Sequence, residues 1–163
     1  MYIIKKTLNN NVVIATKNDL QYILVGKGIG FAKNENDIIN NENSIEKVFV
    51  SLDIFNNKDI DEAILGVAQE IIAIAENDLG ENLNNRIHVG LTDHIHFAIK
   101  RIYDGINITN PFLSQTKALY EEEYNIAAKA VELIRERIGI DVPEDEIGFI
   151  ALHIRASRPN MED

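Results

Sequence analysis

The feature of this sequence that most constrains its fold is a change in hydrophobic periodicity near residue 57. Up to Val50 the apolar residues form short β-branched runs, whereas beyond the polar triplet Asn56-Asn57-Lys58 they recur every three to four residues. The first pattern is typical of strands, and the second is typical of amphipathic helices. The sequence therefore predicts a β domain over residues 1–56 and a helical domain over residues 57–163, with the triplet as a hinge.

The β domain is predicted to be a small antiparallel sheet of four strands, at Tyr2–Leu8, Val12–Thr16, Gln21–Val25 and Glu46–Leu52. The triplet Asn9-Asn10-Asn11 predicts a tight turn between the first two strands, since asparagine tolerates a left-handed backbone. The polar stretch Asn34–Asn43 predicts a surface loop. A sheet of this size buries only a marginal core, so we expect a second copy of the chain to cover its apolar face.

The helical domain is predicted to be an all-α bundle of four or five helices, which makes the whole chain an α+β protein of two domains. Asp59 and Glu62 resemble a capping box that starts the first helix, and Gly139 is typical of a helix stop. Helices are expected from Asp59 to near Gly80, from Asn84 to Tyr103, from Pro111 to Gly139, and from Pro143 to Arg155.

Two histidines lie at equivalent places on their predicted helices. At 100° per residue, His94 falls on the edge of an apolar stripe that includes Leu91 and Ile95, and His153 falls on the same edge of the stripe around Ile154. A half-shielded histidine suits a group that accepts a phosphoryl group and reports it to the packing beneath. The alternative is a structural histidine at the edge of the core. His96 comes out nearly opposite the stripe.

Several other kinds of chemistry are not supported by the sequence. The spacing of His88, His94 and His96 does not place three ligands on one helical face, so no metal site is predicted. Gly26-Lys27-Gly28 lacks the serine or threonine of a nucleotide-binding loop, and no cofactor or catalytic residue is expected. The absence of cysteine and of a leader favours the cytoplasm, and the apolar run Ile71–Ala75 is too short for membrane insertion.

The charge is distributed unevenly between the two domains. The formal net charge is −10, but residues 1–56 hold six lysines and six acidic residues, so the whole deficit lies in the remainder. A neutral domain is compatible with nucleic acid, whereas an acidic one repels phosphate. Asparagines of the turn could bond RNA bases, Lys6, Lys27 and Lys33 could contact phosphates, and Phe31 could stack on a base. Plain turn chemistry remains the alternative.

Six motifs together resemble one protein family. Lys6–Val12, Gly26–Phe31 and Ile45–Phe49 are similar to the co-antiterminator RNA-binding domain of the BglG/SacY family of transcriptional antiterminators. Leu91–Ile95, Asn110–Phe112 and Glu146–Ile154 are similar to that family's first phosphotransferase-system regulation domain. The resemblance extends over the whole chain, and the order and spacing of the motifs make it specific. Family members usually continue into a second regulation domain, which this sequence does not contain.

The resemblance implies a homodimer that binds an RNA hairpin in a sugar-operon leader and prevents the overlapping terminator from forming. It further implies phosphorylation by HPr and a sugar-specific enzyme II, with His94 and His153 as the acceptors. The implied RNA-binding residues are Lys6, Asn9, Asn10, Asn11, Gly26, Lys27, Gly28 and Phe31. Two alternatives stay open: a histidine phosphotransfer relay protein whose β domain only dimerises, and a metal-responsive dimer.

Overall fold

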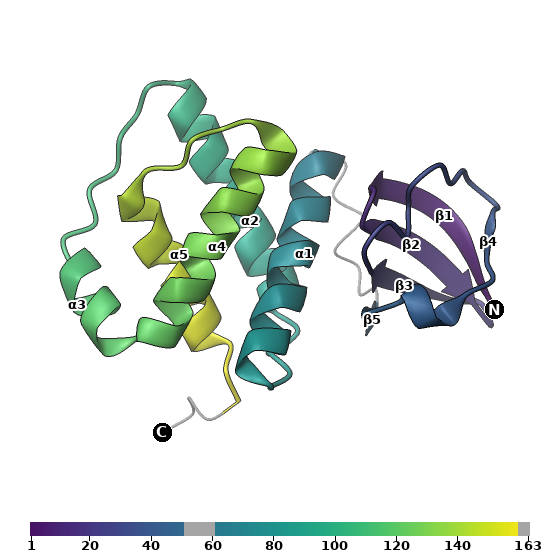
Figure 1. Ribbon diagram of the computed structural model, residues 1–163. Helices are drawn as coiled ribbons and strands as arrows, with labels where there is room; N and C mark the ends of the chain where they lie inside the picture. Colours follow the sequence, from purple (N-terminus) through teal and green to yellow (C-terminus); the bar gives the residue numbers. More distant parts are fainter. Residues whose placement is uncertain (51–60, 160–163) are drawn as a thin grey trace. The chain divides into compact units, whose positions relative to one another are not determined.

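The computed structural model describes residues 1–50 and 61–159 of the chain, which divides into two units, Met1–Ala73 and Ile74–Asp163 (Figure 1). The predicted domain boundary between residues 56 and 57 and the predicted hinge both lie outside the described residues. The first unit contains the sheet and the beginning of the first helix, and the second contains the remaining helices.

The described part of the first unit contains one antiparallel sheet of five strands in the order β4-β1-β2-β3-β5, which are labelled in Figure 1. The four predicted strands are present, although residues 51 and 52 lie outside the described part. The fifth strand, β4, corrects the prediction of a surface loop over Asn34–Asn43. Ile39 pairs with Tyr2 and is buried, so this apolar residue in a polar stretch extends the sheet beyond β1. The strands are β1 Tyr2–Asn9, β2 Val12–Lys17, β3 Leu20–Val25, β4 Ile38–Ile39 and β5 Lys47–Val50, with a 3-10 turn at Glu42–Ser44.

Both faces of the sheet carry buried apolar residues near its centre. Alternate residues such as Ile4, Val13 and Leu24 form one apolar cluster, while Val12 and Ile23 on the opposite face are also fully buried. Apolar residues of the sheet that remain exposed include Ile3, Leu20, Val48 and Val50. A homodimer stays a prediction from the family resemblance.

The described residues form five helices, within the predicted range of four or five (Figure 1). The Asp61 carboxylate caps the first helix by accepting a hydrogen bond from the Ala63 N–H at 2.8 Å, whereas the predicted cap, Asp59, lies outside the described residues. The single long helix predicted after Pro111 is in fact two, because Tyr120 has a non-helical backbone (φ −124°, ψ 57°). The helices are α1 Glu62–Leu79, α2 Ile87–Tyr103, α3 Leu113–Leu119, α4 Glu121–Ile138 and α5 Glu144–Ala156.

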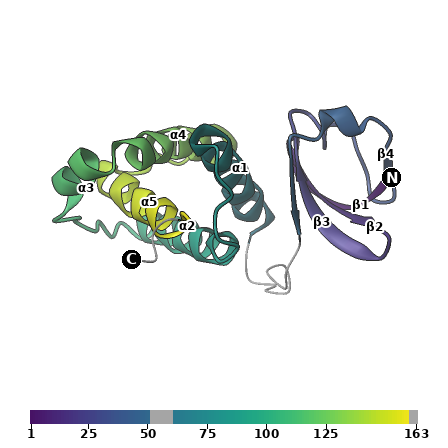
Figure 2. The same ribbon diagram turned by 90° about the horizontal axis from the view of Figure 1, so that it is seen from below.

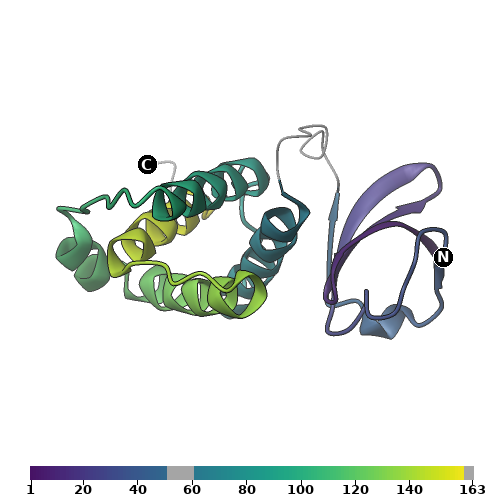
Figure 3. The same cartoon turned by 90° about the horizontal axis from the view of Figure 1, so that it is seen from above.

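Helix α5 lies between α2 and α4, as Figures 2 and 3 show from opposite sides. Its inward face carries Ile150, Ala151 and Ile154, and α2 faces it with the predicted stripe that includes Leu91 and Ile95. Gly139 adopts the left-handed conformation (φ 80°) that ends α4, as predicted. This packing places the edge of the α2 stripe against the edge of the α5 stripe.

Gly148 is the point of closest approach on α5, and we expect its replacement by alanine to lower the free energy of unfolding by about 1–3 kcal/mol. A methyl group there would collide with the side chains of Asn110 and Leu113. Asn110 cannot yield easily, because it is buried, donates to the Asp145 carbonyl at 3.3 Å and accepts from the Phe112 N–H at 3.0 Å.

Urea unfolding of Gly148→Ala beside Gly90→Ala would test this expectation. Gly90 is also helical, but the nearest atom to an added methyl group is 3.8 Å away, so its substitution should be neutral or slightly stabilising. Equal effects of the two variants would contradict the assigned close approach.

Candidate functional site

The two predicted phosphoryl acceptors meet at the contact between α2 and α5. The ring centroids of His94 and His153 lie 4.9 Å apart with an interplanar angle of 51°, and both side chains are half-buried. Gly90 of α2 faces the ring of His153, whose Nδ1 lies 3.8 Å from the position of an added methyl group. Helical spacing placed each histidine on the edge of its own apolar stripe. Only the structure shows that these two edges lie against each other.

Glu146 joins His94 to a guanidinium group. Its Oε2 lies 3.0 Å from His94 Nε2, and its Oε1 accepts a hydrogen bond from Arg101 Nη2 at 2.8 Å. The Glu146 side chain is only 6% exposed. Glu146 was not predicted as a site residue, although a signal was present: it precedes His153 by seven positions, as Arg101 follows His94 by seven.

The site favours an ionised carboxylate at Glu146 and a neutral imidazole at His153. Burial alone would raise the pKa of Glu146, but hydrogen bonds from His94 and Arg101 outweigh it and hold the pKa below its usual value. Burial lowers the pKa of His153, and the nearby charge of His94 lowers it further. A neutral imidazole has a free electron pair on one nitrogen, which is the form that attacks phosphorus.

His96 lies apart from this pair, as its position on the helix predicts. Its ring contacts Phe97 edge-on, with centroids 5.2 Å apart, and its Nδ1 is buried with no hydrogen-bond partner among the described residues. Within residues 1–50 and 61–159, no group of three His, Cys, Asp or Glu side chains is arranged to hold a metal ion.

In the predicted RNA-binding turn, two of the three asparagine side chains form hydrogen bonds with other residues of the chain. The amides of Asn9 and Asn11 each donate to the Glu70 carboxylate at 2.9 Å. Asn9 Oδ1 also accepts from the Asn11 N–H, and Asn11 Oδ1 accepts from the Gly28 N–H, both at 2.8 Å. Asn10 is exposed, and its side chain forms no hydrogen bond in the described part of the chain.

The glycine-containing loop lies directly against this turn. Its backbone donates from Gly26 N to Asn11 O and from Gly30 N to Asn10 O, both at 2.9 Å. A methyl group on Gly30 would lie 2.5 Å from the Asn9 carbonyl oxygen, and Gly28 has a positive φ of 73°. The glycines of this loop therefore permit both a close approach to the turn and a left-handed backbone.

Three predicted RNA contacts differ in how they are placed around the turn and loop. Lys27 and Phe31 are exposed on the loop, and the Phe31 side chain is 67% exposed. Lys6 is also exposed but forms an ion pair with Glu62. The structure thus brings Asn10, Lys27 and Phe31 to one surface, which we call the turn surface.

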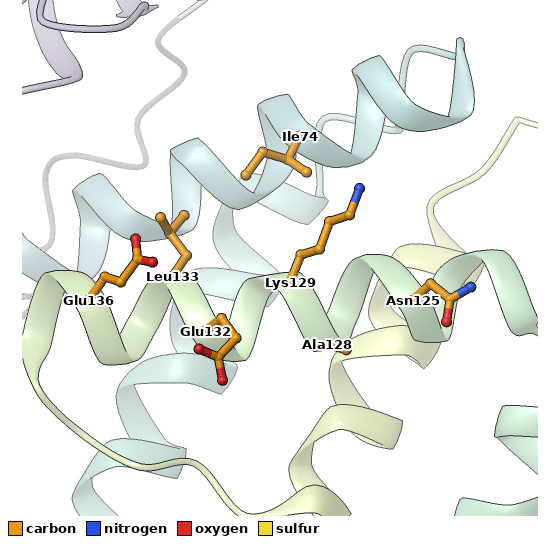
Figure 4. Close-up of a pocket in the computed structure, with 7 residues that line it drawn as sticks. All are labelled: Ile74, Asn125, Ala128, Lys129, Glu132, Leu133 and Glu136. Atoms are coloured by element: carbon orange, nitrogen blue, oxygen red, sulfur yellow. The ribbon is translucent and has the colours of Figure 1, made fainter.

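A shallow groove in the helical unit contains no residue of either candidate site. Figure 4 shows Ile74 of α1 facing Leu133 and Lys129 of α4, and Lys129 forms an ion pair with Asp78 at 2.7 Å. The groove is open and contains neither His94 nor His153. Its lining is Ile74, Asn125, Ala128, Lys129, Glu132, Leu133 and Glu136. No helix of the described residues is long and apolar enough to cross a membrane.

Comparisons with known proteins match each half of the chain to a described domain family. Residues 2–58 match the family described as the CAT RNA binding domain, and residues 69–157 match the PRD domain. The chain is 39% identical over 168 residues to Protein GlcT of Staphylococcus saprophyticus and 39% identical over 171 residues to Transcription antiterminator LicT of Bacillus subtilis. In each case 98% of this chain is covered, but only 59% and 60% of the relative.

A solved structure matches the chain along nearly its whole length. The crystal structure of GlcT CAT-PRDI has a TM-score of 0.74 and 39% identity, and the match covers 98% of this chain and 99% of that one.

Proposed function

The chain belongs to the BglG/SacY family of transcriptional antiterminators, which join a CAT RNA-binding domain to a PRD domain, and from that premise we propose how its two sites work together. As a homodimer, it binds an RNA hairpin in a sugar-operon leader and prevents the terminator from forming. HPr and a sugar-specific enzyme II regulate it by phosphorylating His94 and His153. The protein acts as a cytoplasmic regulator without catalytic turnover.

The turn surface is the observation that carries the RNA-binding half of the proposal. Asn10 offers an amide that can bond a base edge, Lys27 offers a charge for a phosphate, and Phe31 offers a face for stacking. Glycines hold the loop against the turn, so the three side chains extend from one rigid piece of backbone. Asn9 and Asn11 support this surface from beneath through Glu70.

The adjoining histidines support the regulatory half. A phosphoryl group adds a charge of about −1.5 to −2 at a helix-packing edge. On His94 it would add this negative charge to the ring that bonds the ionised Glu146, so the electrostatics of the contact between α2 and α5 would change. Phosphorylation would then change the packing of the two helices on which a regulated dimer depends.

Asn10→Ala is expected to weaken binding of the full chain to a bulged RNA hairpin by about ten- to a hundredfold, because one bidentate amide contact is worth about 1–3 kcal/mol. Its melting temperature should not change, since Asn10 makes no side-chain hydrogen bond in the described residues. A gel-shift titration against a sugar-operon leader hairpin would measure the affinity.

Asn40→Ala, at another exposed asparagine of the same unit, is the matched control and should bind like the wild type. A fully paired hairpin of equal length tests specificity. If the chain shows no preference for the bulged hairpin, the RNA-binding proposal fails. Transfer of phosphate onward to another protein would then favour the histidine relay, which the 4.9 Å spacing of the two rings also fits.

A further inference from the structure

We propose that Glu146 selects the tautomer of His94, so that Nδ1 rather than Nε2 accepts the phosphoryl group. This inference rests on the proposed function, because it concerns the chemistry of one of its acceptors. Glu146 acts as a positioning residue, and Arg101 holds Glu146 in place.

The first step is the direction of the hydrogen bond between Glu146 and His94. An ionised carboxylate only accepts hydrogen bonds, and the ion pair with Arg101 at 2.8 Å keeps Glu146 ionised. At 3.0 Å from Oε2, Nε2 of His94 must therefore carry the hydrogen. In the neutral ring, the free electron pair then lies on Nδ1.

The second step is the rigidity of the carboxylate. Arg101 donates to Oε1 at 2.8 Å, and the carboxylate is almost fully shielded from solvent. An arginine has no acceptor, so it can only bind an oxygen. One oxygen of Glu146 is thus fixed on Arg101, and the other remains directed at His94.

The third step is access to the free nitrogen. His94 is half-buried, and its Nδ1 has no hydrogen-bond partner among the described residues. Nδ1 of His96 is buried without a partner, whereas Nδ1 of His94 does not belong to the buried atoms that lack one. Nδ1 of His94 is consequently not fully buried, whereas Nε2 faces Glu146.

The transfer itself balances with these groups. The electron pair of Nδ1 forms the new N–P bond while the P–N bond of the donor breaks, and its electron pair leaves with the donor nitrogen. The His94 ring keeps its hydrogen on Nε2 and becomes positively charged. The Glu146 carboxylate stabilises that charge, as a carboxylate does for the imidazolium of a catalytic triad.

The Glu146→Gln substitution should invert the tautomer. Arg101 can bind only the oxygen of the new amide, so the NH₂ group faces His94 and donates to Nε2. The hydrogen of the neutral ring must then move to Nδ1. Long-range ¹H–¹⁵N NMR of the full chain above pH 7.5 should show hydrogen on Nε2 in the wild type and on Nδ1 in Glu146→Gln, with at least a tenfold change in their ratio.

Glu144→Gln is the matched control, because Glu144 is an exposed acid in the same helical turn and should leave the tautomer unchanged. Hydrogen on Nδ1 in the wild-type protein would overturn the proposal, whatever the stability of the variant. So would an unchanged tautomer in a Glu146→Gln protein that remains folded.

Phosphorylation with phosphoramidate then tests the acceptor atom. Peptide analysis should find the Nδ1 isomer of phosphohistidine at His94 in the wild type and a shift to the Nε2 isomer in Glu146→Gln. The Nε2 isomer in the wild type would overturn the proposal. Failure of His94 to take any phosphoryl group, even from phosphorylated HPr, would contradict both the acceptor assignment and the proposed function. The tautomer, measured in the unmodified protein, would still decide the role of Glu146.

Discussion

Replacing Glu123 with alanine is expected to lower the free energy of unfolding by about 3 kcal/mol, because it leaves two arginines without their shared partner. Glu123 is 2% exposed and accepts hydrogen bonds from Arg155 at 3.1 Å and from Arg158 at 3.2 Å. Arg158 also forms two bonds of 2.9 Å with Glu81. One carboxylate therefore connects the start of α4, the end of α5 and the segment that follows α1. The arginines are partly exposed, which keeps the expected loss at the low end of the range for buried pairs.

Urea unfolding at neutral pH would measure the loss. Glu122→Ala is the control, because Glu122 precedes Glu123 in the same helix but is exposed, and its effect should stay within about 0.5 kcal/mol. Glu123→Gln keeps a hydrogen-bond acceptor without the charge and should fall between the two. A loss below 1 kcal/mol in Glu123→Ala would show that the arginines find other partners.

Acidification is expected to destabilise the fold through His88 by about 3 kcal/mol in total. His88 is 2% exposed, and burial lowers its pKa from 6.5 to about 4. Its pKa is depressed in the folded state, so the unfolded chain binds the proton more readily between those two values. Stability is therefore highest above pH 6.5, declines as the pH falls towards 4, and has lost this contribution below that.

Urea unfolding between pH 7 and pH 5 should reveal about 2 kcal/mol of this loss. In His88→Gln the same pH change should have a smaller effect, since the titrating group is gone. His96→Gln controls for the loss of an imidazole from the same helix. Equal pH dependence in wild type and His88→Gln would contradict the assignment, and a His88 NMR titration with a midpoint near 6.5 would do the same.

The sequence predicted the parts of the fold that depend on neighbouring residues. The β-branched strands, the turn at Asn9–Asn11 and the stop at Gly139 all follow from local pattern and backbone preference. The two errors in element assignment arose where local signals were weak. Ile38–Ile39 is too short to show a period, and nothing in the sequence around Tyr120 resembles the glycine or proline that usually interrupts a helix.

The sequence predicted most residues of the candidate sites, but not which of them contact one another. The edge positions of His94 and His153 follow from helical periodicity within each helix. Their contact, and the bridge through Glu146, depends on how α2 and α5 cross, which joins residues 52 positions apart. Likewise, the three asparagines predicted a turn, but only their contacts with Glu70 distinguish Asn9 and Asn11 from Asn10.

This difference gives three adjacent residues two separate evolutionary constraints. Asn9 and Asn11 share one carboxylate, so selection for folding acts on them jointly with Glu70. Asn10 is exposed and therefore free of that constraint. Under the proposed function, only RNA binding selects the residue at this position. A substitution at Asn10 would therefore change the RNA sequence that is recognised without changing the stability of the hairpin that carries this residue.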